Sequence, residues 1–182
     1  LVYDREVRIH RLRDALPRAF SVARVERMDD PAQALERLLG RPLDYRHTAL
    51  VEARPGQLPA ADYAQATALQ ITRYEPNRVQ VQARFPGGGF LVLADAYDDD
   101  WRATVDGRPT AIYPANYLLR GVVVPAGEHT IEFSYEPWTY RVGRIASLAA
   151  LATVAASLWL AWRQRHEVDQ VNRPRPDGHN AR

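Results

Sequence analysis

An uncharged stretch of 18 residues, Ile145 to Trp162, restricts most strongly what this 182-residue chain can fold into. At 1.5 Å per residue, a helix of that length spans roughly 27 Å, close to the hydrocarbon thickness of a bilayer. Apolar side chains lie all round such a helix, as lipid or tight helix packing requires. Aromatic residues typical of membrane interfaces flank it: Trp138, Tyr140, Trp159 and Trp162. We therefore expect a single transmembrane helix over residues 138–162. The alternative is a buried helix of a soluble protein.

Small residues, mostly Ala, make up much of this segment. Faces of small residues allow helices to approach closely in membranes, so we expect other transmembrane helices as partners besides the lipid bilayer. Arginines are more numerous after the helix (Arg163, Arg165, Arg173, Arg175) than before it (Arg141, Arg144). This bias places the C-terminus inside the cell. We predict a disordered cytoplasmic tail over residues 163–182, because it is polar and contains Pro and Gly.

Before the helix, residues 68–137 read as a meander of short strands. Val79, Val81, Ala83 and Phe85 alternate with polar residues, the pattern of a strand with one buried face. The continuous apolar run 90–94 predicts a central strand buried on both faces. Together these patterns predict a mainly β fold, an antiparallel β-sandwich or jelly-roll-like domain with one short helix, followed by the transmembrane α-helix.

The entry region, residues 1–61, reads as strand, helix, strand. A strand is predicted over 16–22 and another over 48–52. Between them Asp30 and Pro31 open a short helix that runs to Leu39, with Gly40 as a C-cap. This region and the meander would form one extracytoplasmic domain over residues 1–137. Because the chain starts in mid-pattern without Met, we expect it to be part of a longer protein.

Composition removes several classes of function. The chain has no Cys, which excludes disulfides, thiolate chemistry and Cys-based metal sites. The net charge is only +2, and its excess lies after Trp162, so the β domain lacks the basic footprint of a nucleic-acid-binding protein. The five His are scattered without metal-ligand spacing, and no catalytic set, metal site or cofactor is predicted.

One loop offers candidate ligand contacts. Asp95, Asp98, Asp99 and Asp100 could together hold a cation such as Ca²⁺. Asp98 to Asp100 directly precede Trp101, so the loop could instead contact a sugar, with Trp101 stacking on the sugar ring. The simpler interpretation is a solvated loop followed by a core aromatic on an alternating strand.

Several short segments follow one another along the chain: 16–20 (LPRAF), 74–79 (YEPNRV), 90–95 (FLVLAD), 101–107 (WRATVDG), 116–122 (NYLLRGV), 125–129 (PAGEH), 133–137 (FSYEP) and Gly143. Taken in this order, they resemble the C-terminal region of the YfhO-like family of bacterial membrane proteins. The family often has Pro-Gly before the Trp, where this chain has Asp99 and Asp100, which predicts a looser loop.

The resemblance implies a polytopic bacterial cell-membrane protein with a glycosyltransferase-C-like core. Such proteins are thought to transfer sugars from polyprenyl-phosphate donors to cell-envelope polymers. Their acidic catalytic residues lie in early extracytoplasmic loops that this chain lacks, so no catalytic residue is carried over. The partners implied are an envelope glycan or a polyprenyl-phosphate sugar. The motif residues have structural roles in turns and core: Asp106, Gly107, Asn116, Gly121, Gly127, His129, Tyr135 and Pro137. A non-catalytic, membrane-anchored glycan-binding or structural module remains the alternative.

Overall fold

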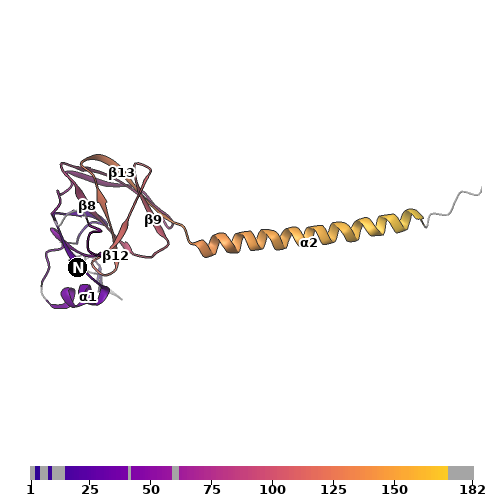
Figure 1. Cartoon of the computed structure of the whole chain (residues 1–182), viewed down its shortest axis with the longest axis horizontal. Coiled ribbons are helices and arrows are strands. Elements are labelled where there is room, and N and C mark those ends of the chain that lie inside the picture. The colour runs from indigo at the N-terminus through magenta and orange to yellow at the C-terminus, as the bar shows by residue number, and fades with distance from the viewer. Residues whose placement is uncertain (1–2, 5–7, 10–14, 41, 59–61, 172–182) are drawn as a thin grey trace, which may run out of the picture. The chain divides into compact units, whose positions relative to one another are not determined.

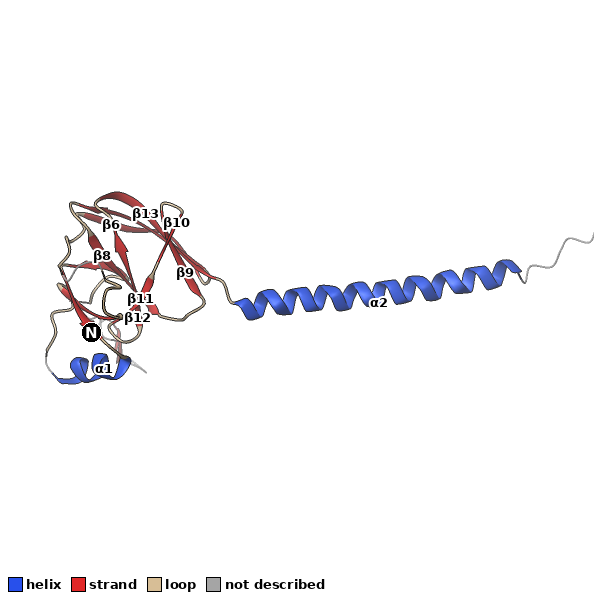
Figure 2. Ribbon diagram, in the orientation of Figure 1, coloured by secondary structure: helices blue, strands red, loops and turns tan. Residues whose placement is uncertain are grey.

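The computed structural model describes residues 3–4, 8–9, 15–40, 42–58 and 62–171. The chain divides into two compact units, Leu1–Glu136 and Pro137–Arg182 (Figure 1). The first unit is built almost entirely of strands, and the second contains one long helix (Figure 2). The fold is therefore mainly β with two helices, and the second of these is a candidate membrane span, as the sequence predicted.

Two sheets form the first unit. One has five strands, all antiparallel, in the order β10-β9-β13-β7-β6. Their bounds are Arg108–Thr110, Trp101–Val105, Gly127–Tyr135, Arg78–Phe85 and Ala68–Glu75. Polar and apolar residues alternate along β7, whose inward side chains Val79, Val81, Ala83 and Phe85 are buried. The period-2 pattern of this segment thus reports a strand with one face on the core.

The second sheet has six strands in the order β3-β8-β12-β11-β5-β4. Their bounds are Ala19–Val22, Gly89–Ala96, Leu119–Val124, Ile112–Ala115, Thr48–Glu52 and Arg24–Met28. Every pairing is antiparallel except β4 with β5. A separate two-stranded pair joins β1 (Tyr3–Asp4) to β2 (Arg8–Ile9).

Helix α1 (Pro31–Gly40) is the crossover between parallel strands β4 and β5. Its start matches the predicted cap, because Asp30 Oδ1 accepts the backbone N–H of Gln33 at 2.9 Å. Strand β4 was not predicted from the sequence. Arg24, Glu26 and Arg27 dominate this strand and only Val25 is buried, so it carries little apolar signal.

Strand β8 is buried on both faces, as the apolar run 90–94 predicted. Leu91 and Leu93 face the core between the two sheets, whereas Phe90 and Val92 belong to a second apolar cluster. That cluster includes Val25 of β4 and Ala49 and Val51 of β5. Strands β3 and β4 are the two edge strands of the six-stranded sheet, yet only Ala23 separates them in the chain. The sheet must therefore curl, which brings β4 and β5 over the second face of β8.

Two tight turns use left-handed backbone. Asp106 and Gly107 have φ of 51° and 77°, which is the type I′ hairpin that the Asp-Gly pair predicted. Asn116 and Tyr117 have φ of 48° and 72°. This turn precedes β12, which begins at Leu119.

The second unit contains helix α2 (Trp138–Val171), of which Trp138–Leu160 is long and apolar enough to cross a membrane. None of that segment is buried. The hydroxyls of Thr153 and Ser157 donate to carbonyls of Ala149 and Thr153, both at 2.9 Å, so neither needs water. The helix continues nine residues past Trp162, into the predicted disordered tail, because no Pro or Gly interrupts it before Pro174. Residues 172–182 lie outside the described part of the chain.

Candidate functional site

A groove of about 800 Å³ lies at the end of the first unit formed by the β7–β8, β9–β10 and β12–β13 turns. Its polar lining comes from four side chains with ionisable groups: Asp62, Asp106, Arg108 and His129. Its apolar lining includes Val105, Val123, Val124, Pro109 and Pro125, with the ring of Tyr63 beside them. We call this the turn groove. Its volume lies within the range of roughly 300–1,000 Å³ that is usual for small-molecule sites.

Two of the predicted motif residues, Asp106 and His129, form a hydrogen-bonded wall of the turn groove. His129 Nδ1 lies 2.6 Å from Asp106 Oδ2, and Nε2 lies 3.1 Å from the carbonyl oxygen of Ala126. Asp106 Oδ1 also accepts the backbone N–H of Thr130 at 2.9 Å. The ring therefore ties the β9–β10 turn to the β12–β13 turn.

This arrangement favours the charged forms of both side chains. The hydrogen bond to Asp106 raises the pKa of His129, with help from the Ala126 carbonyl, because both contacts favour a ring that donates from both nitrogens. The same bond lowers the pKa of Asp106, and the backbone N–H of Thr130 adds to the effect. Gly127 is required here, since its φ is 122° and an added Cβ would lie 3.2 Å from His129 Nε2.

Arg108 supplies a second cationic side chain to the turn groove, and its charge is one of the minor causes of the lowered pKa of Asp106. Within the described part of the chain, its guanidinium makes no hydrogen bond or ion pair with another side chain. Each carboxylate oxygen of Asp106 keeps a lone pair beyond the contacts described above. The groove thus offers donors and acceptors in addition to an apolar floor.

The sequence-predicted contacts Trp101 and Asp98 to Asp100 lie at the other end of the first unit. A second groove of about 390 Å³ extends from there along β9 and β10; it is lined by Tyr97, Asp99, Trp101 and Arg102, among others, and shares Pro109 and Thr110 with the turn groove. The loop is internally bonded rather than open: Asp98 Oδ1 accepts the Asp100 N–H at 2.9 Å, and Tyr97 donates to Asp99 Oδ1 at 2.8 Å. Burial, this bond and nearby Asp98 raise the pKa of Tyr97 to about 12. No group of three or more His, Cys, Asp or Glu in the described ranges could hold a metal ion.

Trp101 is half-buried and packs against the inter-sheet core. The guanidinium of Arg120 lies 3.7 Å from its ring centroid, and the ring of Tyr135 lies 5.2 Å away at a tilt of 47°. Arg120 therefore covers one face of the indole. A sugar contact by Trp101 remains a prediction, and only the uncovered part of the ring is available for it.

Arg120 belongs to a polar cluster that sequence reasoning missed. It is 2% exposed, donates from Nη2 to Asp95 Oδ2 at 3.1 Å, and leaves Nε and Nη1 without partners. Asp95 Oδ1 also accepts from Arg18 at 2.6 Å and from Tyr74 at 3.1 Å. Burial lowers the pKa of Arg120, and Asp95 and Tyr74 oppose that change. The cluster joins β8 and β12 of one sheet to β6 of the other.

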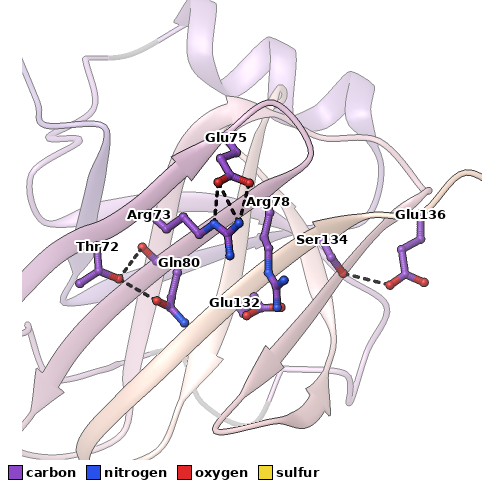
Figure 3. Close-up of polar contacts among 8 residues, drawn as sticks. All are labelled: Thr72, Arg73, Glu75, Arg78, Gln80, Glu132, Ser134 and Glu136. Carbon is purple, nitrogen blue, oxygen red and sulfur yellow. Dashed lines mark hydrogen bonds and ion pairs between the residues drawn. The ribbon is translucent and has the colours of Figure 1, made fainter.

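The outer face of the five-stranded sheet is polar and carries ion pairs (Figure 3). Arg73 makes a bidentate contact to Glu75 at 2.8 and 2.9 Å, and Arg78 pairs with Glu132 at 2.6 Å. The remaining contacts in Figure 3 are Thr72 with Gln80 and Ser134 with Glu136. Exposed pairs like these contribute little stability, so this face reads as a solvated surface.

Other predicted motif residues lie in turns and packing positions. Asn116 Oδ1 accepts the N–H of Leu50 at 2.9 Å, and Gly121 lies against the ring of Phe90. Tyr135 ends β13, and Pro137 begins the second unit. All these placements are compatible with structural roles, which remain predictions.

Comparison with known proteins gives one match. The sequence model of the family described as bacterial membrane protein YfhO matches residues 46–147, from just before β5 into the first turns of α2. Residues 16–20, which also resemble the family, lie outside the match. No curated protein and no solved structure matches the chain. Since the matched residues make up more than half of the chain and include most strands of the first unit and the start of α2, the chain belongs to the YfhO family of bacterial membrane proteins.

Proposed function

We propose that the first unit is a non-catalytic glycan-binding module, held at the outer face of the membrane by α2, that assists sugar transfer by a polytopic YfhO-like protein. The observation that carries this proposal is the turn groove, in which the guanidinium of Arg108 and the carboxylates of Asp62 and Asp106 surround an apolar floor. The C-terminus would lie in the cytoplasm. Other membrane helices of the same protein would surround α2.

The chemistry of the turn groove suits a neutral polyhydroxyl ligand. Sugar hydroxyls both donate and accept, so they can bond to carboxylates and to a guanidinium at the same site. The apolar C–H face of a sugar ring would lie on Val105, Val124 and Pro109. The carboxylates of Asp62 and Asp106 offset the positive charges of Arg108 and His129, so the lining has no net positive charge to favour a phosphate or another anion as the main ligand.

Two separate observations support membrane attachment. The chain belongs to a membrane-protein family, and the apolar side chains along Trp138–Leu160 have no protein to bury them in the described chain. Exposed Leu148, Leu151 and Leu158 would be costly in water, so lipid or neighbouring helices must cover them. A glycan groove on a β unit tethered to the bilayer could hold a growing envelope polymer for a membrane-bound donor such as a polyprenyl-phosphate sugar.

A saccharide array tests the binding proposal with the full chain in detergent micelles. We expect Arg108→Ala to weaken binding about tenfold or more, because a hydrogen bond to a charged group contributes about 1.5–3 kcal/mol. Arg84→Ala is the matched control, since Arg84 is an exposed arginine on the outer face of the same sheet, paired with Glu128. No saccharide binding, or equal binding by both variants, would contradict the proposal.

The second groove, beside Trp101, is the alternative binding site. Arg102→Ala and Asp99→Asn test it without removing the indole that packs against Arg120. Loss of saccharide binding in these variants, with Arg108→Ala unchanged, would move the site to this groove. The assisting role needs its own test: if a longer YfhO-like protein that lacks residues 15–136 keeps full sugar transfer, that role is wrong.

A further inference from the structure

A strained turn with exposed apolar side chains connects β11 to β12. Tyr117 adopts φ of 72°, a conformation that costs a bulky residue about 1–3 kcal/mol and that Gly would adopt freely. Its side chain is 38% exposed, and that of Leu118 is 61% exposed. A strained backbone conformation thus accompanies the exposure of two large side chains at the protein surface. We call Tyr117 and Leu118 the apolar tip.

Backbone hydrogen bonds hold the apolar tip on both sides. The N–H of Asn116 donates to Leu50 at 2.7 Å, and Asn116 Oδ1 accepts from Leu50 in return. On the other side the carbonyl of Leu118 accepts the N–H of Tyr97 at 2.7 Å. The exposure of the tip is therefore a fixed feature of the turn.

The apolar tip lies at the end of the first unit from which the chain leaves for α2. Tyr97 opens the β8–β9 loop, whose last residue, Asp100, accepts the N–H of Glu136 at 3.0 Å. Tyr135, which donates to the β6–β7 turn at Asn77, ends β13. Three residues later Trp138 begins α2, so chain length alone keeps Tyr135 within about 11 Å of the helix start.

The start of α2 has the residues of a membrane interface. Trp138 and Tyr140 are both 66% exposed, and the guanidinium of Arg144 lies 5.9 Å from the ring of Tyr140. Amphipathic rings of this kind settle at the level of the lipid headgroups. The short connection keeps the Tyr135 end of the first unit close to the start of α2, and hence close to the lipid headgroups. Exposed apolar side chains at this end can therefore contact the bilayer surface.

We propose that the apolar tip inserts into the headgroup region of the bilayer beside α2, as a second membrane contact of the β unit. The partner is the bilayer interface itself. Recognition is by apolar insertion, because Asp98 and Asp100 lie in the adjoining loop and would repel anionic headgroups. Exposed Tyr74 and Tyr135 at the same end supply further rings of the interfacial type. This inference does not depend on glycan binding.

The absence of Cys makes a direct test possible, because each single-Cys variant can be labelled at one position. Leu118→Cys carries an environment-sensitive fluorophore at the tip. Gly88→Cys is the control at the turn-groove end, where an added side chain meets open space. The full chain is reconstituted into phosphatidylcholine vesicles, with and without phosphatidylglycerol, and a membrane-impermeant reductant bleaches the label added to the outward-facing population.

We expect bleaching at position 118 to be about tenfold slower than at position 88 in both lipid compositions, as for a group held at the acyl boundary. Adding Tyr117→Gly to Leu118→Cys should restore fast bleaching, because the aromatic anchor is lost. Equal rates at 118 and 88 in both compositions would overturn the proposal. Protection only with phosphatidylglycerol would also overturn it, since it would show headgroup charge rather than apolar insertion. Far-ultraviolet circular dichroism of each variant confirms that the β unit is folded.

Discussion

The two partners of the buried Arg120–Asp95 pair should respond very differently to substitution. Asp95→Asn removes the negative charge but keeps the shape of the side chain. Arg120 would then stay 2% exposed, with two nitrogens already lacking partners and no carboxylate opposite the third. Breaking a buried pair from one side costs about 3–5 kcal/mol. Because the side chain of Asp95 retains 13% exposure, we expect the lower end, about 3 kcal/mol.

Arg120→Met should cost much less. It removes the contact to Asp95 and the cation–π contact to Trp101, each of which favours the wild type by about 1–2 kcal/mol. It also removes two buried nitrogens, Nε and Nη1, that have no hydrogen-bond partner, and each of these costs the wild type about 1–3 kcal/mol. Asp95 keeps Arg18 and Tyr74 as partners. The net change should lie within about 1 kcal/mol of zero.

Trp101 is a suitable probe for this comparison, because it is the only Trp of the first unit. With Trp138, Trp159 and Trp162 replaced by Phe, chemical unfolding in mild detergent can be followed by the fluorescence of Trp101 alone. Hydrogen exchange of the β8 and β12 amides provides a second probe. In the double variant, the cost of Asp95→Asn should shrink to about 1 kcal/mol, since no buried guanidinium is left unpaired. If Arg120→Met costs as much as Asp95→Asn, the unpaired nitrogens carry no penalty and the reasoning is wrong.

Three further variants test other parts of the fold. Gly121→Ala should destabilise the β unit by about 1–3 kcal/mol, because the new Cβ would lie 2.5 Å from the ring of Phe90, and Phe90→Leu in the same chain should recover part of that loss in chemical unfolding. The pKa of His129 is raised in the folded state, so its contribution to the free energy of unfolding is complete below about pH 6.5 and is lost as pH rises through the folded-state pKa. The melting temperatures of the wild type and His129→Gln should therefore converge at alkaline pH. A difference that stays constant with pH would contradict the pairing with Asp106. Tyr117→Gly should raise the unfolding free energy by about 1 kcal/mol by relieving the left-handed strain, and an unchanged or lower value in the same assay would show that the turn stores none.

Local patterns in the sequence determined much of the architecture. Alternation along residues 79–85 identifies β7, and the run 90–94 identifies a strand buried on both faces. The Asp106-Gly107 pair identifies the hairpin between β9 and β10, and the Asp30-Pro31 pair identifies the start of α1. The length and apolar character of the last segment identify the membrane helix. These features depend only on neighbours in the chain, so the residues themselves contain the information.

Tertiary structure alone decided what these elements bring together. Parallel pairing of β4 with β5 cannot be read from Arg24–Met28, because the strand is mostly polar and gains its place from packing on β8. The Asp95–Arg120 pair and the wall of the turn groove each join residues more than 20 positions apart. The register of the sheets determines which side chains meet in these pairs, because a shift of one residue would turn each side chain to the opposite face of its sheet. The sequence by itself thus determined a β domain on a membrane helix, whereas the groove, the buried arginine and the exposed tip arise from how its two sheets pair and pack.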